Sequence, residues 1–409
     1  MLQVSPSFSV ETRQSWVIAG ITVLLLACSF GAPWITVVAL KTIAAEVGGA
    51  RSGPSLAVAL AWFGSGLGGI AMGRIAERVG VRWTVAFGAT MICFGLAIST
   101  FGPGWPIFLG HGMFIGLIGL SGINAPLYIY VSRWFDRRRG SALALISSGT
   151  YVAGALWPPI FERAIAAYGW RTTMLVYGVV TSVIIVTLSL AFLRPPPDET
   201  PLTTAQAARA ASDRSVLGWP PNVVFGMLLG AIFLCCVTMS MPQSHLVAFC
   251  TDLGISASSG AAMLSVLLGT AFLSRQVWGL ISDRIGGLHT IIICSTAQLA
   301  AMAAFLLIKG EAGLFAVSAA FGLGFSGLIP AYVLAARELF PASEAAWRIP
   351  MVLLCSGAGM ATGGWLAGYL YDTFGHYDPA FATGMAFNLA NLAVVAVLVA
   401  RHHLAPARA

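Results

Sequence analysis

Gly73-Arg-Ile-Ala-Glu77-Arg78-Val-Gly80 is a short polar phrase that follows a long apolar stretch of the chain. The chain repeats it 206 residues later as Gly279-Leu-Ile-Ser-Asp283-Arg284-Ile-Gly286, again after a long apolar stretch. Both copies keep a glycine, an acid, an arginine and a second glycine at the same spacing. A chain that repeats itself at half its length is expected to contain two copies of one structural unit.

The composition indicates that this unit is a membrane bundle. Hydrophobic residues occupy 58% of the 409 positions and charged residues only 9%, whereas about a quarter of the residues of a soluble domain are charged. A soluble core could not absorb that much apolar surface, so lipid is the expected solvent. The seven cysteines show neither metal-ligand nor disulfide spacing.

Apolar runs of about 20 residues, the length that crosses a bilayer as a helix, predict twelve transmembrane helices. We expect them at residues 15–42, 53–75, 82–101, 105–131, 141–166, 171–193, 222–248, 258–282, 288–308, 312–337, 346–370 and 378–400. Only one connection is long and polar, and its composition is that of a linker. The sequence therefore predicts an all-α membrane protein with two pseudo-symmetric six-helix bundles, at residues 1–193 and 222–409, joined by a cytoplasmic linker at 194–221.

The lysines and arginines predict how the bundle sits in the membrane. Placing the N-terminus in the cytoplasm leaves most of the 22 basic residues on the inner side, as the positive-inside rule requires. The basic residues that dominate this count are Arg74, Arg78, Arg82, Arg133, Arg137, Arg138 and Arg139. We therefore expect a multi-pass protein of the cell inner (plasma) membrane with both termini cytoplasmic. The net charge of +7 then reflects the membrane topology. The sequence contains no basic patch with interleaved aromatic residues, so we expect no nucleic-acid partner.

With this topology both copies of the phrase lie in short cytoplasmic turns. The glycines allow a tight turn and close helix approach, and the acid can pair with an arginine or accept hydrogen bonds at a helix N-terminus. Such a contact, made only when the cytoplasmic side is shut, would form a gate. The alternative is that these charges merely solvate the turns. The residues that we assign to the gate are Gly73, Glu77, Arg78, Gly80, Gly279, Asp283, Arg284, Gly286 and Arg133.

The doubled phrase resembles the loop signature of the major facilitator superfamily, G-x-x-x-D-R-x-G-R-R. The first copy has Glu77 in place of the usual aspartate and Val81 in place of the first trailing arginine, and the second copy lacks the trailing basic pair. A further stretch, from Arg133-Trp-Phe-Asp to Gly169-Trp170-Arg171, is similar to the same region of monocarboxylate transporters and oxalate–formate antiporters. The resemblance covers nearly the whole chain and implies a transport function.

Arg275 is the residue in which the internal repeat breaks, since it aligns with Gly69 of the first half. An arginine inside a transmembrane span costs about 2.5–3.5 kcal/mol on insertion scales and marks a functional site by default. The alternative is that its side chain reaches the membrane surface, but the cytoplasmic end of the helix near Asp283 is about 12 Å away. The resemblance implies that an arginine here binds the substrate carboxylate, which its planar fork can do with two hydrogen bonds.

The sequence also departs from the families that it resembles. Oxalate–formate antiporters carry a second cation in helix 11, where this chain has no basic residue beyond Arg348 at the mouth of the span. One buried cation suits a substrate with one carboxylate, so the sequence favours a monocarboxylate over a dicarboxylate such as oxalate. Monocarboxylate transporters carry a lysine after Phe-x-x-Pro in helix 1 and an aspartate one turn before the arginine, where this chain has Trp34 and Ala271. At these two positions the chain departs from the proton-coupling scheme of the family.

Other polar and aromatic groups could complete the site. Asn124, Tyr128 and Tyr332 could hydrogen-bond the carboxylate, and the rings of Trp34 and Tyr151 could close over an apolar tail, although buried tyrosines commonly just satisfy helix–helix hydrogen bonds. His111 and His245 are candidates for proton coupling. The alternative for both histidines is a neutral ring packed in the bundle.

No phosphate-binding loop, metal-ligand spacing or nucleophile with a nearby base is present in the sequence, which predicts no enzyme activity and no cofactor or metal. We expect a monomeric secondary active transporter that moves a small organic monocarboxylate anion by alternating access, by proton coupling or anion exchange. An efflux carrier for an amphipathic or aromatic compound is one alternative. A membrane sensor that binds a ligand without moving it is another.

Overall fold

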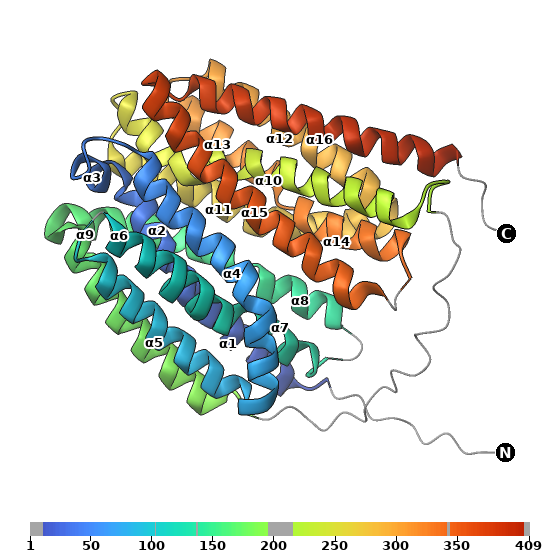
Figure 1. Cartoon of the computed structure of the whole chain (residues 1–409), viewed down its shortest axis with the longest axis horizontal. Coiled ribbons are helices and arrows are strands. Elements are labelled where there is room, and N and C mark those ends of the chain that lie inside the picture. Colours follow the sequence, from blue (N-terminus) through green and yellow to red (C-terminus); the bar gives the residue numbers. More distant parts are fainter. Residues whose placement is uncertain (1–10, 103, 136–137, 195–215, 342–343, 405–409) are drawn as a thin grey trace.

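The computed structural model of the chain describes residues 11–102, 104–135, 138–194, 216–341 and 344–404. The helices before residue 195 are α1 (Arg13–Ser29), α2 (Gly31–Val38), α3 (Leu40–Ala45), α4 (Ser52–Val79), α5 (Val81–Ser99), α6 (Trp105–Leu109), the π-helix η1 (Gly110–Leu120), α7 (Ser121–Ser132), α8 (Arg139–Ser147) and α9 (Gly149–Phe192). Those after residue 215 are α10 (Pro221–Asp252), α11 (Ala257–Ile285), α12 (Gly287–Leu307), α13 (Glu311–Phe325), α14 (Leu328–Leu339), α15 (Ala345–Phe374) and α16 (Asp378–Leu404). We call these two sets the first half and the second half (Figure 1).

Eleven helical stretches of the described residues are long and apolar enough to cross a membrane. One of them, Ser141–Phe192, has 52 residues, which would be about 78 Å of continuous helix, far more than the ~30 Å of a bilayer core. It is broken at Gly169, whose φ of 77° and ψ of 161° are not helical. This break falls between the predicted spans 141–166 and 171–193, so the stretch holds two crossings. The all-α membrane fold is confirmed.

The break at Gly169 is stabilised by the two residues that follow it. Trp170 Nε1 donates to Glu46 Oε1 at 2.9 Å, and the guanidinium of Arg171 donates to both oxygens of Glu46 at 2.8 and 2.6 Å. The hydrogen bonds from Arg171 hold the pKa of Glu46 below its ordinary value. The phrase Gly169-Trp170-Arg171 thus ties the loop after α3 to the turn within α9.

The two halves meet along two pairs of helices, α4 with α15 and α9 with α11. Glycines allow the close approach: Gly66 lies against Leu354, and Gly154 faces Leu268 and the ring of Trp34.

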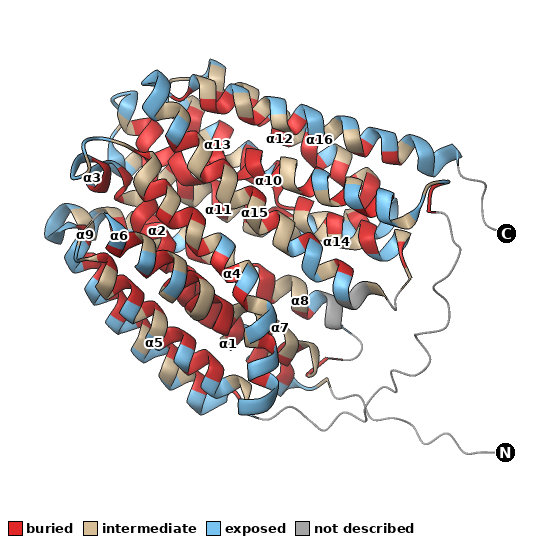
Figure 2. Cartoon of the chain, in the orientation of Figure 1, coloured by how far each residue is buried: buried red, intermediate tan, exposed pale blue. Residues whose placement is uncertain are grey.

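Buried residues gather where helices face one another, and exposed residues follow the outer faces (Figure 2). Along α9 the exposed residues are largely apolar, for example Val176, Val179 and Val183, as expected for a face in contact with lipid. The predicted linker, 194–221, lies mostly outside the described residues.

The bundle has two distinct ends. The turns between α4 and α5 and between α11 and α12 contain Gly80 and Gly286, whose φ values of 98° and 81° favour glycine. The start of α1 and the last turn of α16 lie at the same end, because Trp16 packs on Phe135 beyond α7 and His403 contacts His289 beside Gly286. We call this the motif end. The opposite end, called the Arg51 end, carries the α3–α4 and α15–α16 connections.

Close packing of α10 and α15 gives a stability prediction. A Cβ atom on Gly363 would fall on the backbone carbonyl oxygen of Val237, so Gly363→Ala must push the two helices apart, at a cost of about 1–3 kcal/mol. We expect a melting temperature several degrees lower for the purified variant. Gly230→Ala is the matched control on α10, because nothing lies within 4 Å of its Cβ position. Equal melting temperatures for the two variants would contradict this packing.

Candidate functional site

Arg275 lies in α11, where the two halves face one another. Its guanidinium carbon is 5.1 Å from the centroid of the Tyr151 ring of α9, and Tyr151 packs edge-on against Phe325 of α13 at 5.9 Å. The side chain is half-buried, and its Nε is buried without a hydrogen-bond partner. Buried polar groups of folded proteins are almost always paired. Arg275 therefore offers a charged donor that the described residues do not use.

Tyr128 and Tyr151 bring the first half to this arginine. Tyr128, on α7, is close enough to Arg275 to interact with its charge. Next to Arg275 on the same helix, Gln276 Nε2 donates to Ser148 Oγ at 3.2 Å. Arg275 thus sits at a junction between α11 and the α8–α9 segment.

Two more of the predicted binding residues have unused polar atoms. The indole Nε1 of Trp34 and the amide Oδ1 of Asn124 are both buried without a hydrogen-bond partner. Trp34 lies beside Gly154, where a Cβ atom would be 3.0 Å from its Cζ2, and Gly154 is one turn from Tyr151 along α9. Asn124 is one turn before Tyr128 on α7. The group formed by Trp34, Asn124, Tyr128, Tyr151 and Arg275 is called here the Arg275 site.

The other predicted residues lie elsewhere. The hydroxyl of Tyr332 donates to Asn391 Oδ1 at 2.5 Å within the second half, and the described contacts do not bring it to Arg275. His111 Nε2 is 2.8 Å from Thr36 Oγ1, while its Nδ1 is 3.1 Å from Ser99 Oγ and 3.2 Å from the carbonyl of Ile107. Both ring nitrogens of His111 are therefore bonded inside the first half.

The Arg51 end is held by a network that no sequence pattern indicates. Arg51, just before α4, donates to both oxygens of Asp252 at the end of α10, at 2.5 and 2.7 Å. Its guanidinium also lies 3.5 Å above the centroid of the Tyr371 ring of α15, and its side chain is only 6% exposed. Lys41 adds an ion pair to Asp252 at 2.9 Å. One arginine of the first half thus contacts two helices of the second.

Further hydrogen bonds extend this network to His245. Asp372 accepts the backbone N–H groups of Arg51 and Ser52 at 2.7 and 2.9 Å. The Tyr377 hydroxyl accepts from Arg51 at 2.8 Å and is 2.9 Å from His245 Nδ1. We call the set Lys41, Arg51, Asp252, Asp372 and Tyr377 the Arg51 clamp.

Electrostatics keep the central residue of the clamp charged. Burial by itself would lower the pKa of Arg51, but the hydrogen bond to Asp252 and the interaction with Tyr377 raise it above its ordinary value. His245 lies directly behind the clamp, with Nε2 2.8 Å from the carbonyl of Gly364 and 3.2 Å from Ser55 Oγ. His245 therefore touches both halves, unlike His111.

At the motif end the acids act within each half. Glu77 pairs with Arg133 at 3.7 Å inside the first half. In the second half Glu338 accepts the backbone N–H of Gly287 at 2.9 Å, at the start of α12. Asp283 and Arg284 are exposed. Among the described residues, the two ion pairs that join the halves, Lys41–Asp252 and Arg51–Asp252, are both at the Arg51 end.

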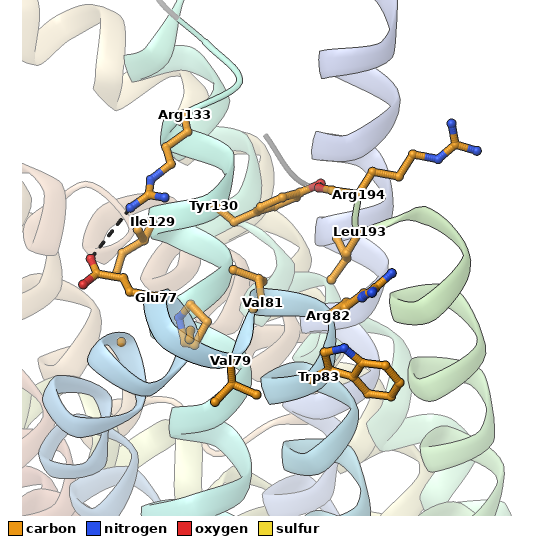
Figure 3. A pocket seen from close by; sticks show the side chains of 14 residues that line it. Glu77, Val79, Val81, Arg82, Trp83, Ile129, Tyr130, Arg133, Leu193 and Arg194 are labelled. Carbon is orange, nitrogen blue, oxygen red and sulfur yellow. Dashed lines mark hydrogen bonds and ion pairs between the residues drawn. The ribbon is translucent and has the colours of Figure 1, made fainter. Parts of the chain in front are cut away.

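A pocket of about 320 Å³ lies at the motif end of the first half (Figure 3). Arg133 and Glu77 face each other across one side of it, while Arg82 and Trp83 lie on another side (Figure 3). The Tyr130 hydroxyl donates to the carbonyl of Arg194 at 2.7 Å. The residues of the Arg275 site do not line this pocket. It borders the first copy of the repeated phrase.

Comparison with known proteins agrees with this architecture. Monocarboxylate transporter 13 of Bos taurus is 26% identical over 84% of this chain and 79% of its own length. An MFS-type transporter of Ophiocordyceps sp. and the agnestins efflux protein of Paecilomyces divaricatus are both 24% identical. These two matches cover 69% and 63% of this chain. The chain spans 62% and 57% of the length of those two relatives, less than two thirds.

Solved structures show the same fold at low sequence identity. A POT family transporter in complex with 5-aminolevulinic acid superposes with a TM-score of 0.70 at 13% identity, over 93% of this chain and 95% of that one. A bacterial homolog of the lysosomal transporter Spinster gives 0.66 at 15% identity, over 96% and 97%.

The relatives and structural neighbours are named as transporters, not enzymes. The sequence model of the Major Facilitator Superfamily matches residues 22–311 and again 228–408. The chain therefore belongs to the Major Facilitator Superfamily of membrane transporters.

Proposed function

We propose that this protein is a secondary active transporter that moves a small organic monocarboxylate across the plasma membrane by alternating access. The observation that carries the proposal is the guanidinium of Arg275, which lies between the halves with its Nε buried and unpaired. A buried charge is costly unless it is paired. A carboxylate would supply the missing partner, since it accepts two parallel hydrogen bonds from the arginine fork.

The surrounding residues suit a small anion with an apolar body. Trp34 Nε1 is a further buried donor, and Asn124 Oδ1 is an unused acceptor that a hydroxyl or a protonated group could meet. Tyr128 and Tyr151 adjoin the Arg275 charge, and their rings can cover apolar atoms of the substrate. The site thus combines one cation with aromatic walls, as expected for a monocarboxylate rather than a dicarboxylate.

The relatives favour two kinds of cargo. The similarity to monocarboxylate transporter 13 supports an organic acid. The similarity to the agnestins efflux protein supports the second candidate, efflux of an amphipathic or aromatic compound. Arg275 favours the acid, because a neutral compound would leave the buried Nε of its guanidinium without an anionic partner.

Flux measurements in proteoliposomes test the anchor role of Arg275. With a panel of radiolabelled small monocarboxylates, we expect Arg275→Lys to lose at least tenfold in flux, since lysine keeps the charge but not the fork. Arg163→Lys is the matched control, because Arg163 is exposed on α9, and it should transport as the parent does. Undiminished anion flux by Arg275→Lys would refute the anchor.

The same preparation separates the alternatives. Flux of neutral aromatic compounds with no response to carboxylates would support the efflux carrier. Saturable binding without flux would support a membrane sensor.

We assign the motif end to the cytoplasm, because it carries the arginines that the positive-inside rule retains there. The Arg51 clamp is then an outer gate, which is closed in this structure. The two copies of the repeated phrase, which include Glu77 and Asp283, form the inner gate when the cytoplasmic side shuts. A proton or a counter-anion would drive the cycle. His245 is the better candidate for proton coupling, because it contacts Tyr377 of the clamp and Ser55 of the opposite half.

The outer-gate assignment predicts the effect of breaking the clamp. A hydrogen bond to a charged group contributes about 1.5–3 kcal/mol, so Asp252→Asn should shift the equilibrium toward open outer states by about tenfold or more. Spin labels at the exposed Thr42 and Thr373, one in each half, should then show a larger population at long distance.

Asp378→Asn is the control for this experiment, because Asp378 pairs with Lys309 inside the second half only. This control should leave the distance distribution of the parent unchanged. The outer-gate assignment fails if Asp252→Asn also leaves that distribution unchanged.

A further inference from the structure

Two histidines from different helices meet at the motif end of the second half. His289 is in the first turn of α12, and His403 is in the last turn of α16. Their Nε2 atoms are 3.2 Å apart, and the ring centroids are separated by 5.2 Å. This pair belongs to neither the Arg275 site nor the Arg51 clamp.

The orientation of His289 is fixed by the backbone. Its Nδ1 lies 3.1 Å from the carbonyl oxygen of Ile285, and a carbonyl can only accept, so Nδ1 must carry the proton. In the neutral ring Nε2 then holds a lone pair that faces His403. A backbone carbonyl on the other ring nitrogen is the usual arrangement behind a metal-binding histidine.

The separation of the two nitrogens suits a shared metal ion. Zinc binds imidazole nitrogen at about 2.0–2.1 Å, and a tetrahedral angle places two such nitrogens about 3.4 Å apart. The observed 3.2 Å thus needs almost no movement. With the lone pair on His289, the proton between two neutral rings would be on His403 Nε2. On metal binding it would have to move to His403 Nδ1, so the step would release no net proton.

We propose that His289 and His403 form a binding site for a divalent transition-metal ion such as Zn²⁺ or Cu²⁺. The ion would connect the start of α12, which follows directly on Gly279–Gly286, to the end of α16. The described residues hold no cluster of three or more histidine, cysteine or acidic ligands, so water completes the coordination. The expected affinity is therefore modest.

The neighbouring charges are mixed. His402 is close by, but its ring centroid is 6.4 Å from His289 and 6.2 Å from His403. Arg401 lies over the Trp219 ring at 4.5 Å, while the Glu338 carboxylate is held at the N–H of Gly287. Two imidazoles are therefore the protein ligands of the site.

Metal titration of the full-length protein in detergent tests this proposal, with a purification tag that contains no histidine. With Cu²⁺, we expect one ion per chain and an electron paramagnetic resonance spectrum showing two coordinated imidazole nitrogens. Calorimetric titration with Zn²⁺ should give the same stoichiometry. His289→Ala and His403→Ala should each weaken binding at least tenfold, and both positions are open enough to tolerate alanine.

His376→Ala and His402→Ala are the controls. His376 is at the Arg51 end, and His402 lies too far away to bind the same ion, so both variants should bind as the parent does. Unchanged binding in His289→Ala and His403→Ala, or a spectrum without two imidazole nitrogens, would show that the pair is only hydrogen-bonded. Because no transport is measured, this outcome is independent of the proposed cargo.

Discussion

An arginine inside a lipid-embedded bundle must have a partner, and this constraint organises the protein. Arg51 and Arg275 differ in whether the protein itself supplies that partner. Arg51 is enclosed by Asp252, Tyr371 and Tyr377 of the other half, so its charge holds the two halves together at one end. Arg275 also lies between the halves, but its Nε has no partner. The first arginine is satisfied by the protein, and the second has capacity left for a ligand.

The two copies of the internal repeat also differ in how their polar groups are paired. Glu77 pairs with Arg133 in the first half, whereas Glu338 holds the start of α12 in the second half. The two turns are therefore alike in backbone but are stabilised by acids from different elements. Gly69, the counterpart of Arg275, lies against Ala125. At this position the first half supplies small packing residues, and the second half supplies a charge.

Much of this architecture could be predicted from the sequence. Apolar length located the spans because a helix must cover the bilayer thickness, and the break at Gly169 fell where two spans had been separated. Arg275 stands out in the sequence because a charge is rare inside such spans and because it breaks the repeat, and the structure places Tyr151 and Tyr128 near it. The Arg51 clamp could not be found, since Arg51 and Asp252 lie 201 residues apart and look like ordinary charges at helix ends. The hydrogen bond that Tyr332 donates also depends on a residue distant in the sequence, Asn391. Pairings that tertiary packing creates leave no local pattern.

Comparing acids with their neutral amides tests most directly whether Arg275 is reserved for a carboxylate. Binding to the purified protein would be measured calorimetrically for a panel of small monocarboxylates, each paired with its primary amide, which has nearly the same size and shape. We expect at least one carboxylate to bind saturably and its amide to bind at least tenfold more weakly, because only the anion pairs with the guanidinium. Amides that bind as tightly as their acids would contradict the account.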